Sequence, residues 1–170
     1  FQYEYFRWVV PIPADGMYIL FAAMGVLALM IACGLFYRVS TSLFFLGYTY
    51  VFLLDQATYN NHFYLICMLS FVLILAPLNS SWSLDVLRGK VEHTDHLPAI
   101  WLWLIRFHMG VVYFYGGIAK FDPDWVEGRA TRELLGVANR GTIFQPLMDY
   151  SFVHLFYAWS GMLFDLLIPF

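Results

Sequence analysis

The chain has 170 residues, of which 61% are hydrophobic and only 12% are charged. A soluble domain typically has about 45–50% apolar and about 25% charged residues, so a water-soluble domain of this length could not bury so much apolar side chain. Aromatic residues reach 21%, which excludes a disordered chain. The formal net charge of −3 comes without any run of Lys or Arg, which excludes nucleic acid as a partner. The composition therefore predicts an integral, multi-pass membrane protein, an all-α transmembrane bundle with the lipid bilayer as a partner.

The hydrophobic segments have the lengths of membrane helices, each of which needs roughly 20 apolar residues. We expect about five membrane helices, near residues 17–37, 41–55, 62–77, 98–120 and 151–170. Arg38 should close the first of them at the membrane interface. Lys and Arg are divided almost evenly between the two sides of such a bundle, so the orientation stays open.

Three further stretches are expected to lie outside these helices. Residues 79–97 carry many charges and should form an aqueous loop outside the hydrocarbon. Residues 125–136 suggest a short amphipathic or interfacial helix, and residues 139–149 a loop. Because the chain opens with FQYEYFRW and stops inside the apolar run FDLLIPF, we expect residues 1–170 to form a single transmembrane domain from a longer protein, with further helices and a soluble domain missing.

An ionisable side chain inside a membrane helix costs about 2.5–3.5 kcal/mol on insertion scales, so each one suggests a function. The candidates are Asp55, His62, Arg106, His108, Lys120, His154 and Asp165. An unpaired guanidinium in a bundle is costly, so we expect Arg106 to pair with an acid such as Asp165. No group of residues in the aqueous loop has the spacing of a strong metal site, so we expect no metal.

Lys120 follows a helical stripe that contains Tyr113, Gly116 and Gly117. The adjacent glycines could leave a shallow slot in which a flat ring lies against the backbone. Alternatively, the glycines allow close helix packing and Lys120 extends to the lipid headgroups. The stripe alone leaves both interpretations open.

The segment DQATYNNHFYL places Asp55, two asparagines and His62 where polar groups are costly. These side chains could form a functional cluster. They could equally satisfy the free backbone groups at the ends of two helices.

Three motifs together carry a resemblance to a known family. YVFLLDQATYNNHFYL, WSLDVL and VYFYGGIAKFDPDWVEG occur in this order and at these spacings. The chain resembles, over nearly its whole length, the membrane core of vitamin K-dependent gamma-glutamyl carboxylases and their bacterial homologues with an HTTM domain. The resemblance implies a membrane enzyme, a carboxy-lyase. It would oxidise reduced vitamin K with O2 to the epoxide, abstract a proton from a protein glutamate, and add CO2.

The resemblance also implies residue roles. The family's catalytic lysine corresponds to Lys120, and its functional histidine and the asparagine before it correspond to His62 and Asn61. A lysine is a base only when it is neutral, and burial can lower the pKa of a lysine by several units. We therefore expect Lys120 and His62 to be catalytic and to face one pocket. Asn61, Gly116, Gly117 and Tyr113 are expected to contact the isoprenoid quinone.

Reduced vitamin K, O2 and CO2 are the implied co-substrates, and a glutamate-containing protein is the implied partner. The location would be the endoplasmic reticulum membrane of a eukaryote or the inner or plasma membrane of a bacterium. The chain departs from the family at Ala119, where the family has the first lysine of a pair, and at Tyr59, where it has tryptophan. Two alternatives stay open: a quinol-oxidising membrane enzyme that does not carboxylate protein, and a membrane scaffold without catalysis.

Overall fold

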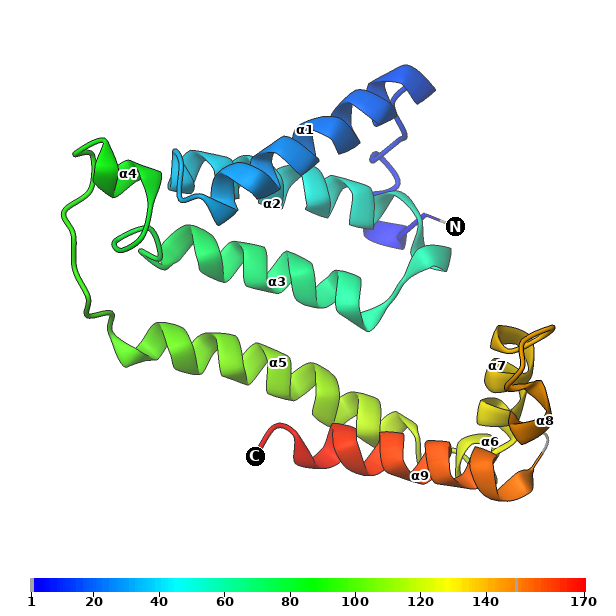
Figure 1. The fold of residues 1–170 in the computed structure, drawn as a ribbon. Helices are drawn as coiled ribbons and strands as arrows, with labels where there is room; N and C mark the ends of the chain where they lie inside the picture. Colours follow the sequence, from blue (N-terminus) through cyan, green and yellow to red (C-terminus); the bar gives the residue numbers. More distant parts are fainter. Residues whose placement is uncertain (1, 149) are drawn as a thin grey trace. The chain divides into compact units, whose positions relative to one another are not determined.

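The computed structural model describes residues 2–148 and 150–170, so Phe1 and Asp149 of the expected segments lie outside it. The described residues form helices without any strand, which confirms the all-α class. The long helices are α1 (Ala14–Ala32), α2 (Tyr37–Leu54), α3 (Asn61–Leu75), α5 (Ala99–Ala119) and α9 (Ser151–Leu167) (Figure 1). The short ones are η1 (Glu4–Phe6), η2 (Gln56–Thr58), α4 (Leu84–Leu87), α6 (Pro123–Val126), α7 (Arg129–Ala138) and α8 (Gln145–Met148).

The five expected segments all contain a long helix, but they do not all qualify as membrane spans. Among the described residues, α1 and α5 are long and apolar enough to cross a membrane. Only 6% of each apolar window is buried within the protein, unlike the core helix of a soluble domain. Helices α3 and α9, with 15 and 17 residues, are apolar but shorter. The structure thus confirms five long helices in the expected segments. Among the described residues, two of these helices are candidate membrane spans.

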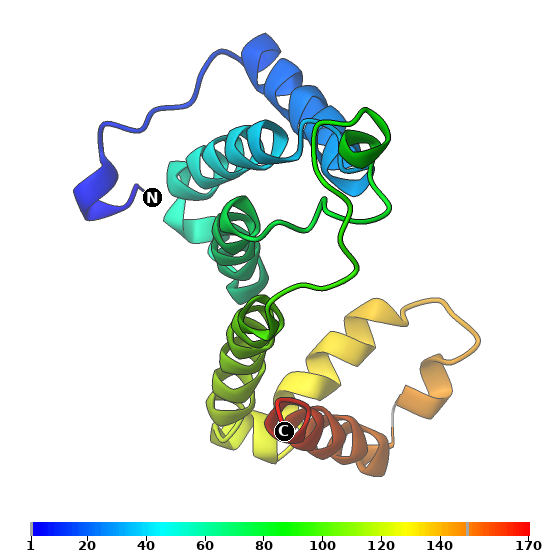
Figure 2. The same ribbon diagram turned by 90° about the vertical axis from the view of Figure 1, so that its left-hand side faces the viewer.

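Two compact units make up the chain, Phe1–His108 and Met109–Phe170. In the first unit, α2 packs against both α1 and α3, and the three helices lie side by side (Figure 1). In the second unit, α9 packs against the short helices α6, α7 and α8 (Figure 2). The motifs that suggest chemistry are divided between these units.

The first helix ends earlier than the hydropathy predicts. Gly34 has a φ of +61°, its N–H donates to the oxygen of Ile31 at 3.0 Å, and the N–H of Leu35 donates to the oxygen of Met30 at 2.8 Å. This pair of bonds is the Schellman ending, which a left-handed glycine permits. Arg38 therefore lies in the first turn of α2, where it donates to the oxygen of Ile74 at 3.0 Å. The expectation that Arg38 closes the first helix is wrong.

The expected amphipathic helix near residues 125–136 is two helices. Gly128 has a φ of +74° and separates α6 from α7. A Cβ at this glycine would lie 3.3 Å from His154 of α9, so the break lets the chain pass close to that helix. The expected loop at 139–149 also contains a short helix, α8.

The motif WSLDVL builds a polar connection at the start of α2. Asp85 is buried, and its carboxylate accepts hydrogen bonds from the backbone N–H of Phe36 at 2.9 Å and of Tyr37 at 3.0 Å. The Asn79 amide donates to the same carboxylate at 3.0 Å, and Arg88 lies 3.6 Å from it. These bonds satisfy backbone N–H groups at the start of α2, which have no acceptor within their own helix. The second motif therefore has a structural role.

Asp85 should make the stability of the protein dependent on pH. Burial alone would raise the pKa of this carboxyl, but the N–H groups of Tyr37 and Phe36, the Asn79 amide and Arg88 lower its pKa overall. A lowered folded-state pKa contributes stability that is present above about pH 4 and is lost as the pH falls further. We expect Asp85→Asn to lower the free energy of unfolding by about 2 kcal/mol at pH 7, because the charged hydrogen bonds are lost.

Thermal melting of the detergent-solubilised protein, followed by tryptophan fluorescence from pH 3 to pH 7, measures this effect. The variant should lose part of the acid sensitivity of the native protein. The matched control is Asp95→Asn, an exposed acid of the same loop, which should melt like the native protein. Equal melting of Asp85→Asn and the native protein at pH 7 would contradict the role of this carboxylate.

Candidate functional site

The sequence KFDPDW follows the end of α5 and leads into α6. The helix α5 ends at Ala119, and the N–H of Lys120 donates to the oxygen of Gly117 at 3.1 Å. The side chain of Asp122 accepts a hydrogen bond from the N–H of Asp124 at 2.8 Å and so caps α6, and Pro123 takes the first helical position. This tight connection fixes the backbone on both sides of Lys120.

The side chain of Lys120 lies inside the second unit. Its Nζ donates to Oδ2 of Asp165 on α9, and the two form an ion pair. Nζ also lies 5.2 Å from the ring centroid of Trp125. The side chains of Lys120 and Asp165 are only 24% and 15% exposed. The ammonium therefore lies between a carboxylate and an aromatic face. A lysine that extends to the lipid headgroups would have its ammonium in water instead.

Trp125 is itself held against α9. Its indole N–H donates to the backbone oxygen of Ala158 at 3.0 Å, and Ala158 is completely buried. Because a donor bond fixes the plane of the ring, the aromatic face next to Lys120 is preorganised. Three elements, the end of α5, α6 and α9, thus define the surroundings of this lysine.

The two glycines of the stripe differ in their surroundings. A Cβ at Gly117 would lie 2.8 Å from the side chain of Leu166, so this glycine allows α5 and α9 to approach closely. A Cβ at Gly116 would lie 3.5 Å from Oδ2 of Asp165, an ordinary contact. Tyr113, one turn earlier, packs edge-on against Phe164, with centroids 6.2 Å apart. Close packing explains Gly117, and quinone contacts of the three residues stay a prediction.

Asp165 has a different partner from the expected one. It bonds to Lys120, whereas the guanidinium of Arg106 lies 5.6 Å from the ring centroid of Trp103, one turn earlier on α5. The expected pair of Arg106 and Asp165 is wrong, because Asp165 pairs with Lys120 at the end of α5, and Arg106 lies about 21 Å earlier along the same helix. Another candidate, His108, is satisfied locally, with Nδ1 at 2.7 Å from the oxygen of Leu104.

The two asparagines and the histidine lie at the start of α3 in the first unit. Asn60 caps the helix, because its Oδ1 accepts from the N–H of His62 at 2.8 Å. Asp55 caps η2 in the same way, accepting from the N–H of Ala57 at 2.9 Å. Asn61 and His62 are exposed residues of the first turn of α3. The capping interpretation holds for Asn60 and Asp55, and it gives no capping role to the exposed side chains of Asn61 and His62.

The contact between His62 and Asn60 fixes the proton on the imidazole ring. Nδ1 of His62 lies 2.9 Å from Oδ1 of Asn60. That atom already accepts from a backbone N–H, so it is the amide oxygen, and an oxygen of this kind only accepts. Nδ1 therefore carries the proton, and Nε2 of the neutral ring is a hydrogen-bond acceptor.

One residue with functional character was given no role by the sequence. His154 on α9 is only 4% exposed, and neither ring nitrogen has a hydrogen-bond partner within the described residues. Thr131 of α7 donates to the backbone oxygen of the same histidine at 2.9 Å. Its position on the buried stripe with Ala158 and Met162 could have been found from the helical spacing.

Comparison with known proteins places the chain in a family. The family model described as HTTM domain matches residues 1–170, the whole chain. No solved structure matches the chain. The three motifs and the match over the complete length point to the same conclusion: the chain belongs to the HTTM-domain family, whose domain is characteristic of the vitamin K-dependent gamma-glutamyl carboxylases and whose members are membrane-associated.

Proposed function

We propose that the protein is a vitamin K-dependent gamma-glutamyl carboxylase, a multi-pass membrane enzyme in which Lys120 is the catalytic base. The observation that carries this proposal is the position of Lys120, whose Nζ is bonded to Asp165 and lies next to Trp125. A lysine whose only task was to reach the headgroups would be extended and solvated. The carboxylation reaction is proposed from the family, and the choice of Lys120 as the base is supported by its surroundings.

The residues around Lys120 fit a phenolic ligand. An amine can accept the proton of a phenol, and the Trp125 face and the edge-on pair of Tyr113 and Phe164 provide aromatic surface in the same unit. Reduced vitamin K would supply a phenolic proton and the electrons that reduce O2. The chain itself would bind the quinol, exclude water and move the proton.

The ion pair must give up a proton before Lys120 can act as a base. Nζ donates directly to Oδ2 of Asp165, so the ammonium proton can pass to that carboxylate and leave a free amine. The low solvent exposure of both side chains favours this transfer, because a neutral acid and a neutral amine need less solvation than an ion pair. The amine then accepts the phenolic proton and becomes an ammonium again.

His62 and Asn61 are proposed to orient the quinol. Since Nε2 of neutral His62 is an acceptor, it suits a phenolic O–H, and a protonated ring would donate to the phenolate formed later. The Asn61 amide can donate to a quinol oxygen in either state. Oxygen, CO2 and the glutamate of a protein substrate would complete the reaction.

A double assay with the full-length protein tests this function. The protein is incubated with reduced vitamin K, O2, labelled bicarbonate and a glutamate-containing peptide, and epoxide and fixed label are measured together. We expect both products in proportion. Epoxide without fixed label would overturn carboxylation in favour of a quinol-oxidising enzyme, and neither product would favour a scaffold.

A further inference from the structure

A pocket of about 410 Å³ lies in the second unit, between α7 with the turn that follows it and α8. Its volume is within the range of about 300–1,000 Å³ that is usual for small-molecule sites. Gly136 of α7 lines the pocket, and a Cβ at this glycine would meet no other side chain or backbone within 4 Å. We call it the arginine pocket, because Arg132 and Arg140 also line it.

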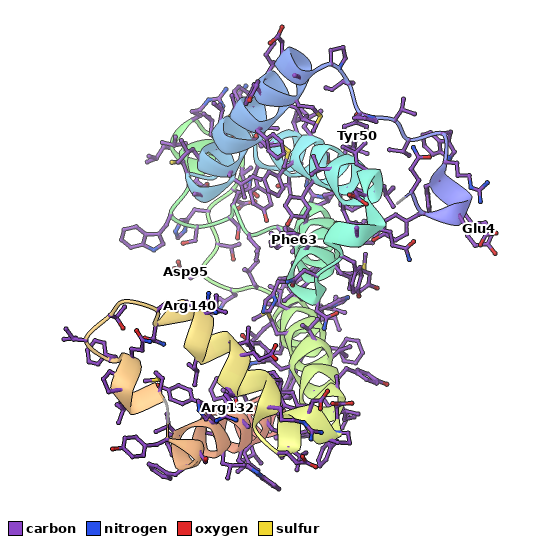
Figure 3. The ribbon with its side chains drawn as sticks, turned by 90° about the vertical axis from the view of Figure 1, so that its right-hand side faces the viewer. Glu4, Tyr50, Phe63, Asp95, Arg132 and Arg140 are labelled. Carbon is purple, nitrogen blue, oxygen red and sulfur yellow. The ribbon has the colours of Figure 1, made fainter. Side chains whose placement is uncertain are left out.

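The two arginines of the pocket have no partner in the part of the chain that the structure describes. Figure 3 shows Arg132 on α7 and Arg140 beyond the end of this helix. Neither guanidinium forms an ion pair, a hydrogen bond or a contact with an aromatic ring among these residues. Arg129 on the same helix, by contrast, pairs with Asp124 and Glu127 at 2.7 Å each. Both guanidiniums of the pocket are therefore available to a ligand.

The charge and the donors of the pocket favour an anion. Glu133 is the one acid among the described lining residues, so two guanidiniums face a single carboxylate. The side-chain oxygen of Gln145 accepts from the N–H of Gly141 at 2.9 Å, which leaves the amide N–H groups of Gln145 as donors. Arginine binds phosphate through two parallel hydrogen bonds, which makes it the usual residue of phosphate sites.

The elements around the pocket expose large apolar side chains. Ile143 is 88% exposed, and Phe144 and Leu147 are more than half exposed. On α7, Leu134 and Val137 are exposed and lie three residues apart, beside the face that carries the arginines. A helix with cations on one face and exposed apolar residues on the next is typical of an element that lies in the membrane interface. This position would bring the arginine pocket to the level of lipid phosphates.

We propose that the arginine pocket binds the headgroup of one anionic phospholipid, with its phosphate between Arg132 and Arg140 and its hydroxyl groups toward Glu133. Phosphatidylglycerol has both features, a single negative charge and hydroxyl donors that suit a carboxylate. Basic pockets beside membrane helices bind lipid headgroups in the same way. The exposed apolar side chains favour a lipid over a soluble phosphate, because only a lipid also covers them. The proposal concerns binding alone and does not depend on the proposed carboxylation.

Lipid binding to the delipidated full-length protein tests this site. The protein in neutral detergent is titrated with phosphatidylglycerol or with phosphatidylcholine, and bound lipid is counted by native mass spectrometry. We expect one saturable molecule of phosphatidylglycerol that an equal concentration of phosphatidylcholine does not displace. Arg132→Gln and Arg140→Gln should each weaken its binding by about tenfold, because each removes a charged hydrogen bond to the phosphate.

The matched control is Arg129→Gln, which removes the same charge from the same helix. Because Arg129 pairs with Asp124 and Glu127 and does not line the pocket, the affinity for phosphatidylglycerol should stay unchanged. Gly136→Leu keeps both arginines, fills the space over α7 and favours the helix, so it should weaken lipid binding without lowering the melting temperature. If an arginine variant melts early in lipid-free detergent, Gly136→Leu decides the question.

Other results would overturn the proposal. Equal affinity for the two lipids, or unchanged affinity in Arg132→Gln, Arg140→Gln and Gly136→Leu, would show solvated arginines and ordinary contact with lipid. Displacement of phosphatidylglycerol by a similar concentration of inorganic phosphate would assign the pocket to a soluble anion. Displacement by a glutamate-containing peptide, but not by the same peptide with glutamine, would assign the pocket to the carboxylate of a protein substrate.

Discussion

Lys120→Arg is expected to be nearly as inactive in epoxide formation as Lys120→Ala, with each rate lowered by about 10²–10⁴. Arginine can keep the ion pair with Asp165 and the contact with Trp125, so the second unit should stay folded. Its guanidinium remains protonated at any accessible pH and cannot accept the phenolic proton. The measurement is the rate of epoxide formation by each full-length variant at matched expression.

The chain offers a matched control for this experiment. Lys90 is an exposed lysine of the loop after α4, and Lys90→Arg should retain the native rate. Quinone binding should survive Lys120→Arg better than turnover does, because the lysine contributes mainly to proton transfer. A near-normal rate in Lys120→Arg would rule out Lys120 as the base and favour a lysine that only carries positive charge.

His62→Ala is expected to lower epoxide formation by about 10²–10³, the usual contribution of one positioned hydrogen bond to a developing charge. The same substitution leaves the cap of α3 in place, because Asn60 accepts from the backbone N–H of residue 62, which alanine retains. The loss should therefore be one of rate, without a large change in melting temperature. Epoxide formation and thermal melting of the same samples separate the two effects.

An exposed histidine of the loop provides the comparison. His96→Ala removes an imidazole outside the proposed machinery and should leave the rate unchanged. If His62→Ala and His96→Ala had equal rates, the asparagine–histidine segment would be a helix cap alone.

The ends of helices show how far local sequence goes. Hydropathy alone extends the first helix to residue 37, because nothing in apolar content distinguishes the turn from the helices around it. Gly34 is a local signal for the ending, since glycine adopts positive φ readily. A second reason for glycine at this position comes from a distant part of the sequence. A Cβ at Gly34 would collide with Ser83, a residue of the loop after α3.

The partner of Lys120 shows what local sequence leaves out. Lys120 and Asp165 are 45 positions apart, and the packing of α5 on α9 decides which cation reaches the carboxylate. The sequence offered Arg106 for this role, which is equally plausible by residue type. The close approach at Gly117 and Leu166 brings the end of α5, and so Lys120, to Asp165.

By itself, the sequence determined the membrane character, the all-α class, the order of the long helices and the family, because apolar composition, helix length and ordered motifs are properties of the chain alone. Only the tertiary structure decided that WSLDVL caps α2 through Asp85 and that Asp165 pairs with Lys120. Each of these depends on a contact between residues distant in sequence or on burial by other helices. Such contacts are set by how whole helices pack, which the spacing of residues within one helix does not specify.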